Sequence, residues 1–195
     1  MTELSDLRHY IRVYDDALDP SLCTSMIDAF ASLEMHQVRN GRGTRRGLDD
    51  SSWTELNVGQ FADDGFRALF RDQVDRGLER YNRDVGLVLP LPNSPLTAEL
   101  RMKRYLPGGS DQFQLHFDAI YEKANRYLVF LWYLNDVEDG GETRFPRLDL
   151  AVRAKAGRLL MFPPYWMYQH EGAPPRSGDK YIVGTYLLFA PFRPH

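Results

Sequence analysis

The second half of the chain, from Ala98 onward, is built from short runs of strand-forming residues separated by turns. The turns contain Pro107-Gly108-Gly109, Asp139-Gly140-Gly141, Pro163-Pro164 and Ser177-Gly178-Asp179, and the runs between them read ELRMKRYL, FQLHFDAIY, RYLVFLWYLN, GETRF, RLLMFP and KYIVGTYLLF. β-Branched and aromatic residues favour strands, and Gly and Pro end them. Many short strands at this spacing predict a β-sandwich or jelly roll.

The first half predicts helices that cover this sheet. A strand is expected over His9–Tyr14, and Asp19-Pro20 is typical of a helix start, with apolar residues following at helical spacing up to Leu33. A second helix is expected over about residues 61–82. Residues 37–52 are rich in Gly and Arg without periodicity, which predicts a mobile loop. We expect one domain over residues 1–195, with helical support and a lid loop in 1–97 and the β-rich core in 98–190.

Composition excludes several classes of protein. The single cysteine, Cys23, allows neither a disulfide framework nor a thiolate zinc site. The chain has no run of about 18 apolar residues to span a membrane, and its first residues do not resemble a signal peptide. A net charge of -3 does not favour a nucleic-acid partner. We therefore expect a cytoplasmic protein without a membrane partner.

Three residues in the second half have the chemistry of a metal site. His116 and Asp118 are two apart in an expected strand and would share one face. Taken alone, this pair is equally typical of an ordinary exposed sheet face. His170 follows a later apolar strand, and two histidines with one carboxylate form the three-cornered ligand set of non-haem Fe(II). The other three histidines, His9, His36 and His195, have no such context and are expected on the surface or in packing.

Lys180 begins the last apolar run, ten residues after His170. Alternation places Lys180, Ile182 and Gly184 on one face of that strand. A lysine directed into the interior is costly unless it meets an anion, and a dicarboxylate would be a suitable partner. The alternative is a surface lysine at a strand end.

The ordered set of these motifs resembles the Fe(II)- and 2-oxoglutarate-dependent oxygenases of the prolyl 4-hydroxylase type. The resemblance covers roughly Ala98 to Ala190 and more loosely the first half. The matching segments are His116-x-Asp118, His170, Lys180, Tyr105-Leu106-Pro107-Gly108-Gly109, Tyr133-Leu134-Asn135, Gly140-Gly141-Glu142-Thr143-Arg144-Phe145-Pro146, Ala156-Gly157-Arg158 and Gly178-Asp179-Lys180-Tyr181.

The resemblance implies a double-stranded β-helix, which is a cupin-like jelly roll with flanking helices. It implies Fe(II) bound by His116, Asp118 and His170, and 2-oxoglutarate paired with Lys180. Tyr105 and Tyr133 stand where the family's tyrosines hydrogen-bond this cosubstrate, although both could serve only as aromatic packing.

The reaction implied is hydroxylation of an unactivated C–H bond with O2, releasing succinate and CO2, with ascorbate as an optional reductant. The acceptor would be a small molecule, such as an amino acid or related metabolite, or a short prolyl peptide.

Two sets of cations are candidates for substrate binding. Arg101 and Lys103 alternate in phase with Tyr105 and would face the interior, unless they are solvated at a strand rim. Arg45 and Arg46 lie in the Gly/Arg-rich loop, which is either a lid over the substrate or a solvated loop.

Two other functions compete with this interpretation. One is a non-catalytic jelly roll that only binds a ligand in the same pocket, which the loss of a metal ligand or of Lys180 would favour. The other is a cupin-type metal dioxygenase that does not use 2-oxoglutarate. Such a site would usually have a further histidine near the first, where this chain has Asp118.

Overall fold

The structure is a computed structural model, and it describes residues 6–44, 47–94 and 96–190. Its two α-helices are α1 (Pro20–Ser32) and α2 (Asp64–Val85). Single 3-10 turns cover Leu7–Tyr10, Glu34–His36, Val58–Gln60, Tyr121–Lys123, Pro146–Leu148 and Trp166–Tyr168. The strands are β1 (Arg12–Tyr14), β2 (Val38–Gly41), β3 (Ser52–Asn57), β4 (Arg101–Tyr105), β5 (Phe113–His116), β6 (Arg126–Tyr133), β7 (Thr143–Phe145), β8 (Leu150–Val152), β9 (Leu159–Phe162), β10 (His170–Gly172) and β11 (Lys180–Leu188).

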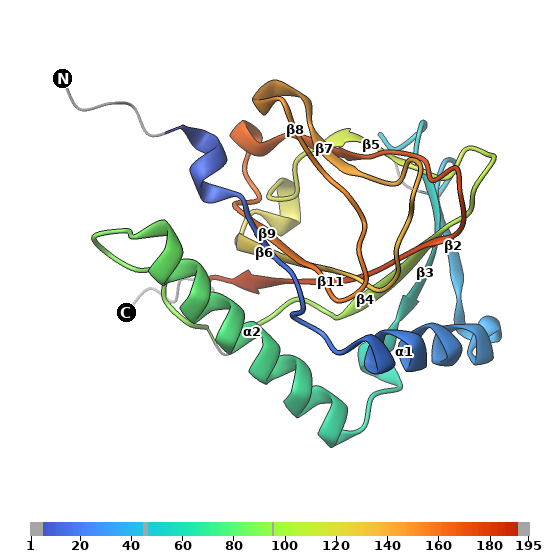
Figure 1. Cartoon of the computed structure of the whole chain (residues 1–195), viewed down its shortest axis with the longest axis horizontal. Coiled ribbons are helices and arrows are strands. Elements are labelled where there is room, and N and C mark those ends of the chain that lie inside the picture. The colour runs from blue at the N-terminus through green and yellow to red at the C-terminus, as the bar shows by residue number, and fades with distance from the viewer. Residues whose placement is uncertain (1–5, 45–46, 95, 191–195) are drawn as a thin grey trace.

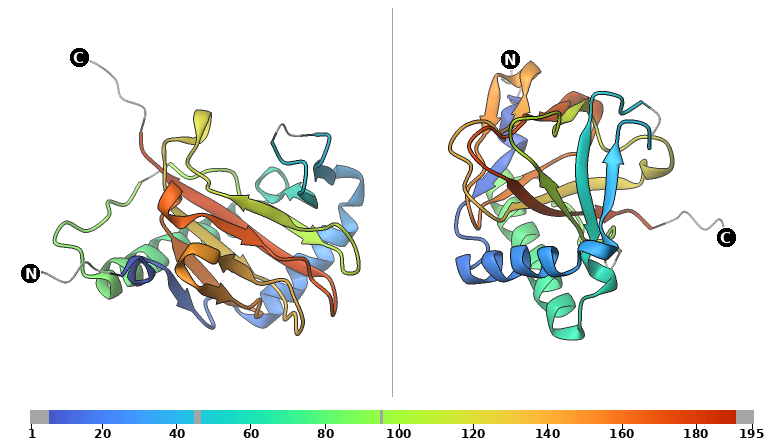
Figure 2. Two further views of the ribbon diagram at one scale, coloured as in Figure 1. Left: turned by 90° about the horizontal axis from the view of Figure 1, so that it is seen from above. Right: turned by 90° about the vertical axis from the view of Figure 1, so that its right-hand side faces the viewer.

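Two antiparallel sheets form a jelly roll, as the sequence predicts. The larger sheet has the order β1-β9-β6-β11-β4-β3-β2, and the smaller has the order β5-β10-β7-β8. In Figure 1 the smaller sheet lies above the larger one, and both α-helices lie below the larger sheet. The right-hand view of Figure 2 shows the same layering from the side. The helices therefore cover one face of the larger sheet and leave its other face to the space between the sheets.

Strand alternation divides the core into two clusters. On β6, Phe130 and Trp132 face the helices, while Val129 and Tyr133 face the smaller sheet. The same alternation holds on β11, where Val183 belongs to the helix-facing cluster and Ile182 to the one between the sheets. Successive side chains of a strand point to opposite faces, so a fully buried strand is apolar on both. The site discussed below lies within the second cluster.

The helices begin and end where local chemistry requires. Asp19 accepts a hydrogen bond from the Ser21 N–H, with Pro20 at the first position of α1. Asp63 accepts from the Phe66 N–H at the start of α2, and Gly86 ends that helix with φ of 68°. The second helix thus runs a few residues later than the sequence predicts.

Two expectations for the first half are wrong in detail. The predicted strand over His9–Tyr14 is a 3-10 turn followed by the three-residue β1. The predicted loop over 37–52 contains β2, which pairs with β3 at the edge of the larger sheet. Arg39 on β2 is ion-paired with the buried Asp111, which anchors this edge strand from the side.

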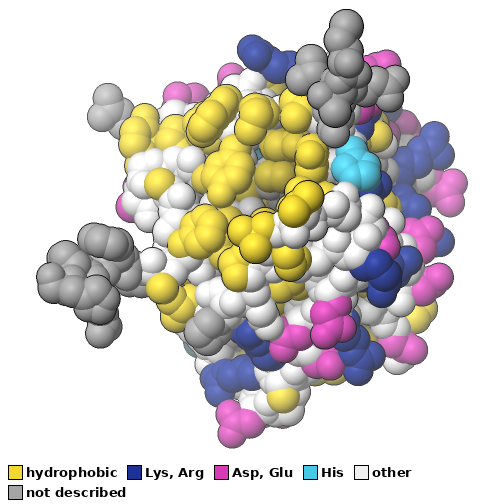
Figure 3. All heavy atoms as spheres, turned by 90° about the vertical axis from the view of Figure 1, so that its left-hand side faces the viewer, with side chains coloured by type: hydrophobic (Ala, Val, Ile, Leu, Met, Phe, Trp, Pro, Cys, Tyr) yellow, Lys and Arg dark blue, Asp and Glu magenta, His cyan; other side chains and the backbone are white. Residues whose placement is uncertain are grey.

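Hydrophobic side chains also gather on the outside of the molecule. The face seen at the left of Figure 1 collects them around a shallow hollow, while charged groups lie toward the rim (Figure 3). Exposed large hydrophobic side chains include Val88 and Leu89, which follow α2, and Trp166, which precedes β10. Among the described residues, no helix has both the length and the hydrophobicity needed to cross a lipid bilayer.

Candidate metal and cosubstrate site

His116 and His170 are brought together by the pairing of β5 with β10. The two residues are direct partners in the antiparallel register, and their rings lie 4.3 Å apart. Each Nδ1 lies close to the carbonyl two residues earlier, at 2.8 Å from Gln114 O and 3.0 Å from Tyr168 O. An Nδ1–H that donates to a carbonyl leaves Nε2 as the lone-pair nitrogen, and this is the usual arrangement of metal-binding histidines.

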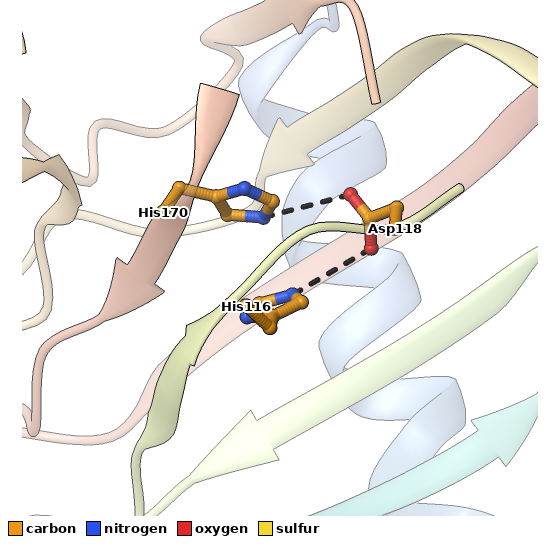
Figure 4. A group of neighbouring side chains, drawn as sticks. All are labelled: His116, Asp118 and His170. Atoms are coloured by element: carbon orange, nitrogen blue, oxygen red, sulfur yellow. Dashed lines mark ion pairs between the residues drawn. The ribbon is translucent and has the colours of Figure 1, made fainter. Parts of the chain in front are cut away.

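Asp118 completes the group from outside the strand. Strand β5 ends at His116, so the prediction that both residues share one strand is wrong. The chain bends instead, and the Asp118 and Ala119 N–H groups both donate to the Pro164 carbonyl at 3.0 Å. The Asp118 carboxylate then faces both imidazoles, with 3.6 Å from Oδ1 to His116 Nε2 and 3.6 Å from Oδ2 to His170 Nε2 (Figure 4).

The electrostatics of the group suit a divalent cation. One donor atom from each of the three side chains lies within 4.8 Å of the others. Burial, together with the neighbouring His116, lowers the pKa of His170 to about 4, so this imidazole is neutral at pH 7. Burial alone would raise the pKa of Asp118, but the two imidazoles and Arg126 outweigh it and hold that pKa below its usual range. Two neutral imidazoles and one carboxylate are the donor set of non-haem Fe(II).

Aromatic rings enclose the two imidazoles. Phe113 stacks on His116 at 4.0 Å, and Trp53 stacks on Phe113 at 4.6 Å. Phe162 packs edge-on against His170 at 4.7 Å. Such a wall fixes the ring orientations and keeps bulk water from the ligand side.

Lys180 is buried near the same place. Its exposed fraction is 2%, and its Nζ lies 5.4 Å from the Tyr105 ring and 5.6 Å from the Tyr133 ring. Among the described contacts, no hydrogen bond or close ion pair joins this ammonium to a carboxylate, although the charge of Glu142 acts on it and opposes the effect of burial on its pKa. Burial lowers the pKa of Lys180 to about 7. A buried ammonium without an anion is costly, and an anionic ligand would remove that cost.

Two glycines leave room around this lysine. A Cβ on Gly141, whose φ is +72°, would stand 3.4 Å from Lys180 Cδ, and a Cβ on Gly172 would stand 4.0 Å from Lys180 Nζ. Gly172 is two residues after His170 on β10 and pairs with Phe113. The Lys180 ammonium of β11 is therefore close to Gly172 of β10, the strand that begins with His170.

Comparison with known proteins shows which family this chain resembles. Residues 100–188 match the family model described as the 2OG-Fe(II) oxygenase superfamily, where 2OG is 2-oxoglutarate. This part of the chain is similar to that superfamily. A putative prolyl 4-hydroxylase of Acanthamoeba polyphaga mimivirus is 22% identical over 94% of this chain and 80% of its own length. Human prolyl 4-hydroxylase subunit alpha-3 is 28% identical over 62% of this chain, which spans only 25% of that larger protein.

Solved structures show the same fold. A viral collagen prolyl hydroxylase from Paramecium bursaria Chlorella virus-1, in complex with 2-oxoglutarate, superposes with a TM-score of 0.63 at 20% identity, covering 91% of this chain and 94% of that one. A Pseudomonas putida prolyl-4-hydroxylase gives 0.62 at 21% identity, covering 93% and 94%. A Trichoplax adhaerens prolyl hydroxylase, in complex with a hypoxia-inducible-factor peptide fragment, gives 0.67 at 19% identity, covering 92% and 84%.

Family and donor set agree on the cofactors. The chain is a prolyl 4-hydroxylase-like oxygenase whose cofactor is Fe(II) and whose cosubstrates are 2-oxoglutarate and O2. The imidazole–carboxylate group has the nitrogen and oxygen donors that Fe(II) requires. The buried Lys180 ammonium has the charge that the distal carboxylate of 2-oxoglutarate requires.

The two tyrosines predicted for the oxygenase's cosubstrate lie beside Lys180. Tyr105 pairs with Lys180 across β4 and β11, and it is buried. Tyr133 is also buried, and its hydroxyl donates to Thr143 Oγ1 at 2.7 Å. Sequence reasoning did not single out Thr143, although it lies within the Gly-Gly-x-Thr segment of the resemblance. Its oxygen accepts the hydrogen bond that the Tyr133 hydroxyl donates, so the Tyr133 oxygen can itself accept a hydrogen bond from another group.

Arg101 and Lys103 line the oxygenase's main cavity, on the face predicted from alternation. The cavity has a volume of about 1250 Å³ and also includes His116 and Asp118 among its lining residues. Arg101 is ion-paired with the buried Glu55 at 2.5 Å and also with Glu99. Its charge is therefore already matched by protein carboxylates, whereas the sequence-based expectation was a substrate anion.

Glu55 is the residue that sequence reasoning missed. It is 3% exposed, and Oε2 accepts from the Trp53 indole at 3.0 Å. Burial would raise its pKa, but Lys103, Trp53 and Arg101 outweigh that and keep the pKa lowered. The alternating pattern of SWTELN places Trp53 and Glu55 on one face, and this was the available signal.

The other predicted cations have different positions. Arg45 and Arg46 lie outside the described residues. Of their neighbours, Arg42 donates to the Asp49 carbonyl at 2.7 Å, while Arg39 is bound to Asp111. Gly47 and Leu48 line the cavity, so the far end of this loop does form part of its wall.

Proposed function

We propose that this oxygenase hydroxylates a C–H bond of a peptide substrate, with His116, Asp118 and His170 as the Fe(II) ligands and Lys180 as the partner of 2-oxoglutarate. The observation that carries the proposal is a buried ammonium, with no direct ion-pair partner among the described contacts, close to Gly172 of β10, the strand that begins with His170 of the imidazole–carboxylate group. When bound, Fe(II) with 2-oxoglutarate supplies the activation of O2 that places one oxygen atom in a substrate C–H bond and leaves succinate and CO2.

The protein residues act by binding, orienting and excluding water. The Gln114 and Tyr168 carbonyls hold both imidazoles as Nε2 donors, and the Pro164 carbonyl holds the Asp118 backbone against them. Lys180 fixes the distal carboxylate of the cosubstrate through charge. The ring of Phe113 shields the metal side from water, so that the reaction is confined to the bound substrate.

The size and rim of the cavity support a peptide over a free metabolite. Its volume of about 1250 Å³ exceeds the roughly 300–1,000 Å³ of ordinary small-molecule pockets. Leu115, Ile120 and Tyr121 line it and are 44%, 36% and 83% exposed, which makes an apolar rim open to the outside. Of the similar structures, the viral protein is a collagen prolyl hydroxylase and the Trichoplax protein is bound to a hypoxia-inducible-factor peptide fragment, and this supports a prolyl residue as the acceptor here.

Anaerobic reconstitution tests the proposal. Fe(II) and 2-oxoglutarate together should give a metal-to-ligand charge-transfer band, and exposure to air should release succinate. His170→Ala should abolish both signals, while His36→Ala, which changes a histidine outside this group, should leave both intact. Absence of the band and of succinate in the unmodified protein would refute the proposed function.

A substrate panel addresses the acceptor. Proline-containing peptides, free amino acids and nucleotides are compared by the succinate formed above the substrate-free rate, with hydroxylation confirmed by mass spectrometry. We expect stimulation by peptides, and prolyl peptides above others. Stimulation by a free amino acid alone would overturn the peptide assignment and leave the reaction class intact.

A further inference from the structure

Asp118 is not held by a sheet. Because β5 ends at His116, no strand ladder sets the position of the carboxylate that joins the two imidazoles. Its backbone is fixed by the Pro164 carbonyl, which accepts from the Asp118 N–H at 3.0 Å. The backbone contact leaves the carboxylate free to rotate about its side-chain bonds, so something else must orient it.

Tyr186 on β11 contacts the Asp118 carboxylate and orients it. Its hydroxyl donates to Asp118 Oδ1 at 3.0 Å. The Tyr186 ring is itself held by Arg126, whose guanidinium lies 3.7 Å above it. Arg126 also reaches the Asp118 backbone carbonyl at 3.4 Å. Strands β6 and β11 of the larger sheet thus support a loop residue that faces the smaller sheet.

The hydrogen bond distinguishes the two oxygens of the carboxylate. Oδ1 accepts a hydrogen bond from the Tyr186 hydroxyl, whereas Oδ2, 3.6 Å from His170 Nε2, has no hydroxyl donor among the contacts described. Oδ2 is therefore the stronger donor for a cation. A carboxylate that binds through one oxygen leaves more coordination positions open than one that binds through both, and the reaction requires open positions for cosubstrate and O2.

We propose that Tyr186 is a positioning residue for the metal, because its hydroxyl fixes the Asp118 carboxylate so that Oδ2 is the ligand oxygen. The inference rests on the proposed Fe(II) site and adds to it a residue that does not itself touch the metal. Hydrogen-bonding partners of this kind commonly contribute about 10–100-fold to metal affinity.

Tyr186→Phe tests this inference, since it keeps the ring and the Arg126 contact and removes only the hydroxyl. Tyr127→Phe is the matched control: Tyr127 also donates its hydroxyl, to the Pro92 carbonyl at 2.6 Å, away from the metal ligands. The metal-free proteins are titrated anaerobically with Co(II), followed by its visible absorption, and their thermal midpoints are measured without metal.

We expect the Tyr186→Phe dissociation constant for Co(II) to rise at least tenfold, with the shape of the Co(II) spectrum altered. Tyr127→Phe should bind Co(II) as the unmodified protein does. The metal-free midpoints of the two variants should be similar, because each loses one hydroxyl hydrogen bond.

Three results separate the possible failures. Equal Co(II) affinity and spectrum in Tyr186→Phe and the unmodified protein would overturn the role of Tyr186 and leave the proposed function standing. No Co(II) binding by the unmodified protein would refute the proposed site itself. Equal weakening in both variants would show a general loss of structure and would also overturn the specific role of Tyr186.

Discussion

Replacing Lys180 by methionine should stabilise the cosubstrate-free protein while abolishing its response to 2-oxoglutarate. Methionine has a similar length and no charge, so it fills the space beside Tyr105 and Tyr133 without a buried ammonium. The substitution thus separates the effect of Lys180 on the stability of the fold from its effect on the binding of 2-oxoglutarate.

The magnitude follows from the pKa of Lys180. Burial lowers this pKa from 10.5 to about 7. At about 1.4 kcal/mol for each tenfold change in the protonation equilibrium, the ammonium costs on the order of 5 kcal/mol at pH 7 and below. Relaxation of the surroundings of a buried charge reduces this cost, so we expect methionine to recover at least about 2 kcal/mol, or roughly 4–8 °C in a domain of this size.

The shifted pKa of Lys180 determines the direction in which the stability of the protein changes with pH. Between pH 7 and 10.5 the unfolded chain holds a proton on Lys180 that the folded chain has released, so the stability of the unmodified protein rises with pH in this window. The variant lacks that rise. The advantage of Lys180→Met should therefore be greatest at pH 7 and below and should shrink toward pH 10.

Calorimetry without metal, at pH 6.5, 8 and 9.5, measures this difference. Lys155→Met is the control, because Lys155 is partly exposed and paired with Asp15 at 3.0 Å; that change should cost little at any pH. Added 2-oxoglutarate with metal should raise the midpoint of the unmodified protein and not that of Lys180→Met. A Lys180→Met protein that is less stable at pH 6.5, or whose advantage grows with pH, would refute the reasoning.

Three further outcomes are expected. Lys180 without a ligand has a pKa of about 7, so binding of 2-oxoglutarate should take up nearly one proton at pH 8 and weaken about tenfold from pH 6 to pH 8. Titration calorimetry in buffers of different ionisation enthalpy measures both effects, and a pH-independent affinity would contradict this prediction. Gly172→Val should raise the KM for 2-oxoglutarate roughly tenfold, since a Cβ there already stands 4.0 Å from Lys180 Nζ, whereas Gly178→Ala, which has open space, should leave it unchanged. Asp111→Ala should destabilise the protein by about 1–3 kcal/mol in denaturant melts, because it removes the buried partner of Arg39; an unchanged midpoint would show that this ion pair does not anchor β2.

Much of the β-rich half could be predicted because the residues of each strand and of its flanking turns themselves indicate a strand. The apolar runs and their Gly and Pro turns predict β4, β6, β9 and β11, and alternation correctly places Arg101 and Lys103 toward the cavity. The start of α1 is equally local, since the Asp19 side chain caps its own helix. The single-domain organisation of residues 1–195, the cytoplasmic location and the roles of the individual site residues stay predictions.

The failures share one physical reason, which is that distant partners decide the structure. Strand β2 has a Gly- and Arg-rich sequence with little strand propensity, and it forms because β3 pairs with it and Asp111 holds Arg39. The end of β5 before Asp118 depends on the Pro164 carbonyl, which no local pattern reveals. Glu55 is buried as a charge because Lys103 and Arg101 of β4 lie beside it; alternation along its own strand indicates the face it occupies but not these distant partners.

The pairing of β5 with β10 has a consequence for how the protein matures. These two short strands are far apart in the chain, and their register places His116 directly opposite His170. Contacts between distant segments are slow to form, because a long loop must be closed before they stabilise anything. The three proposed ligands come from residues 116–170, so the donor group is complete only after β5 and β10 have paired. A partly folded chain in which these two strands are still apart would therefore lack the full donor set.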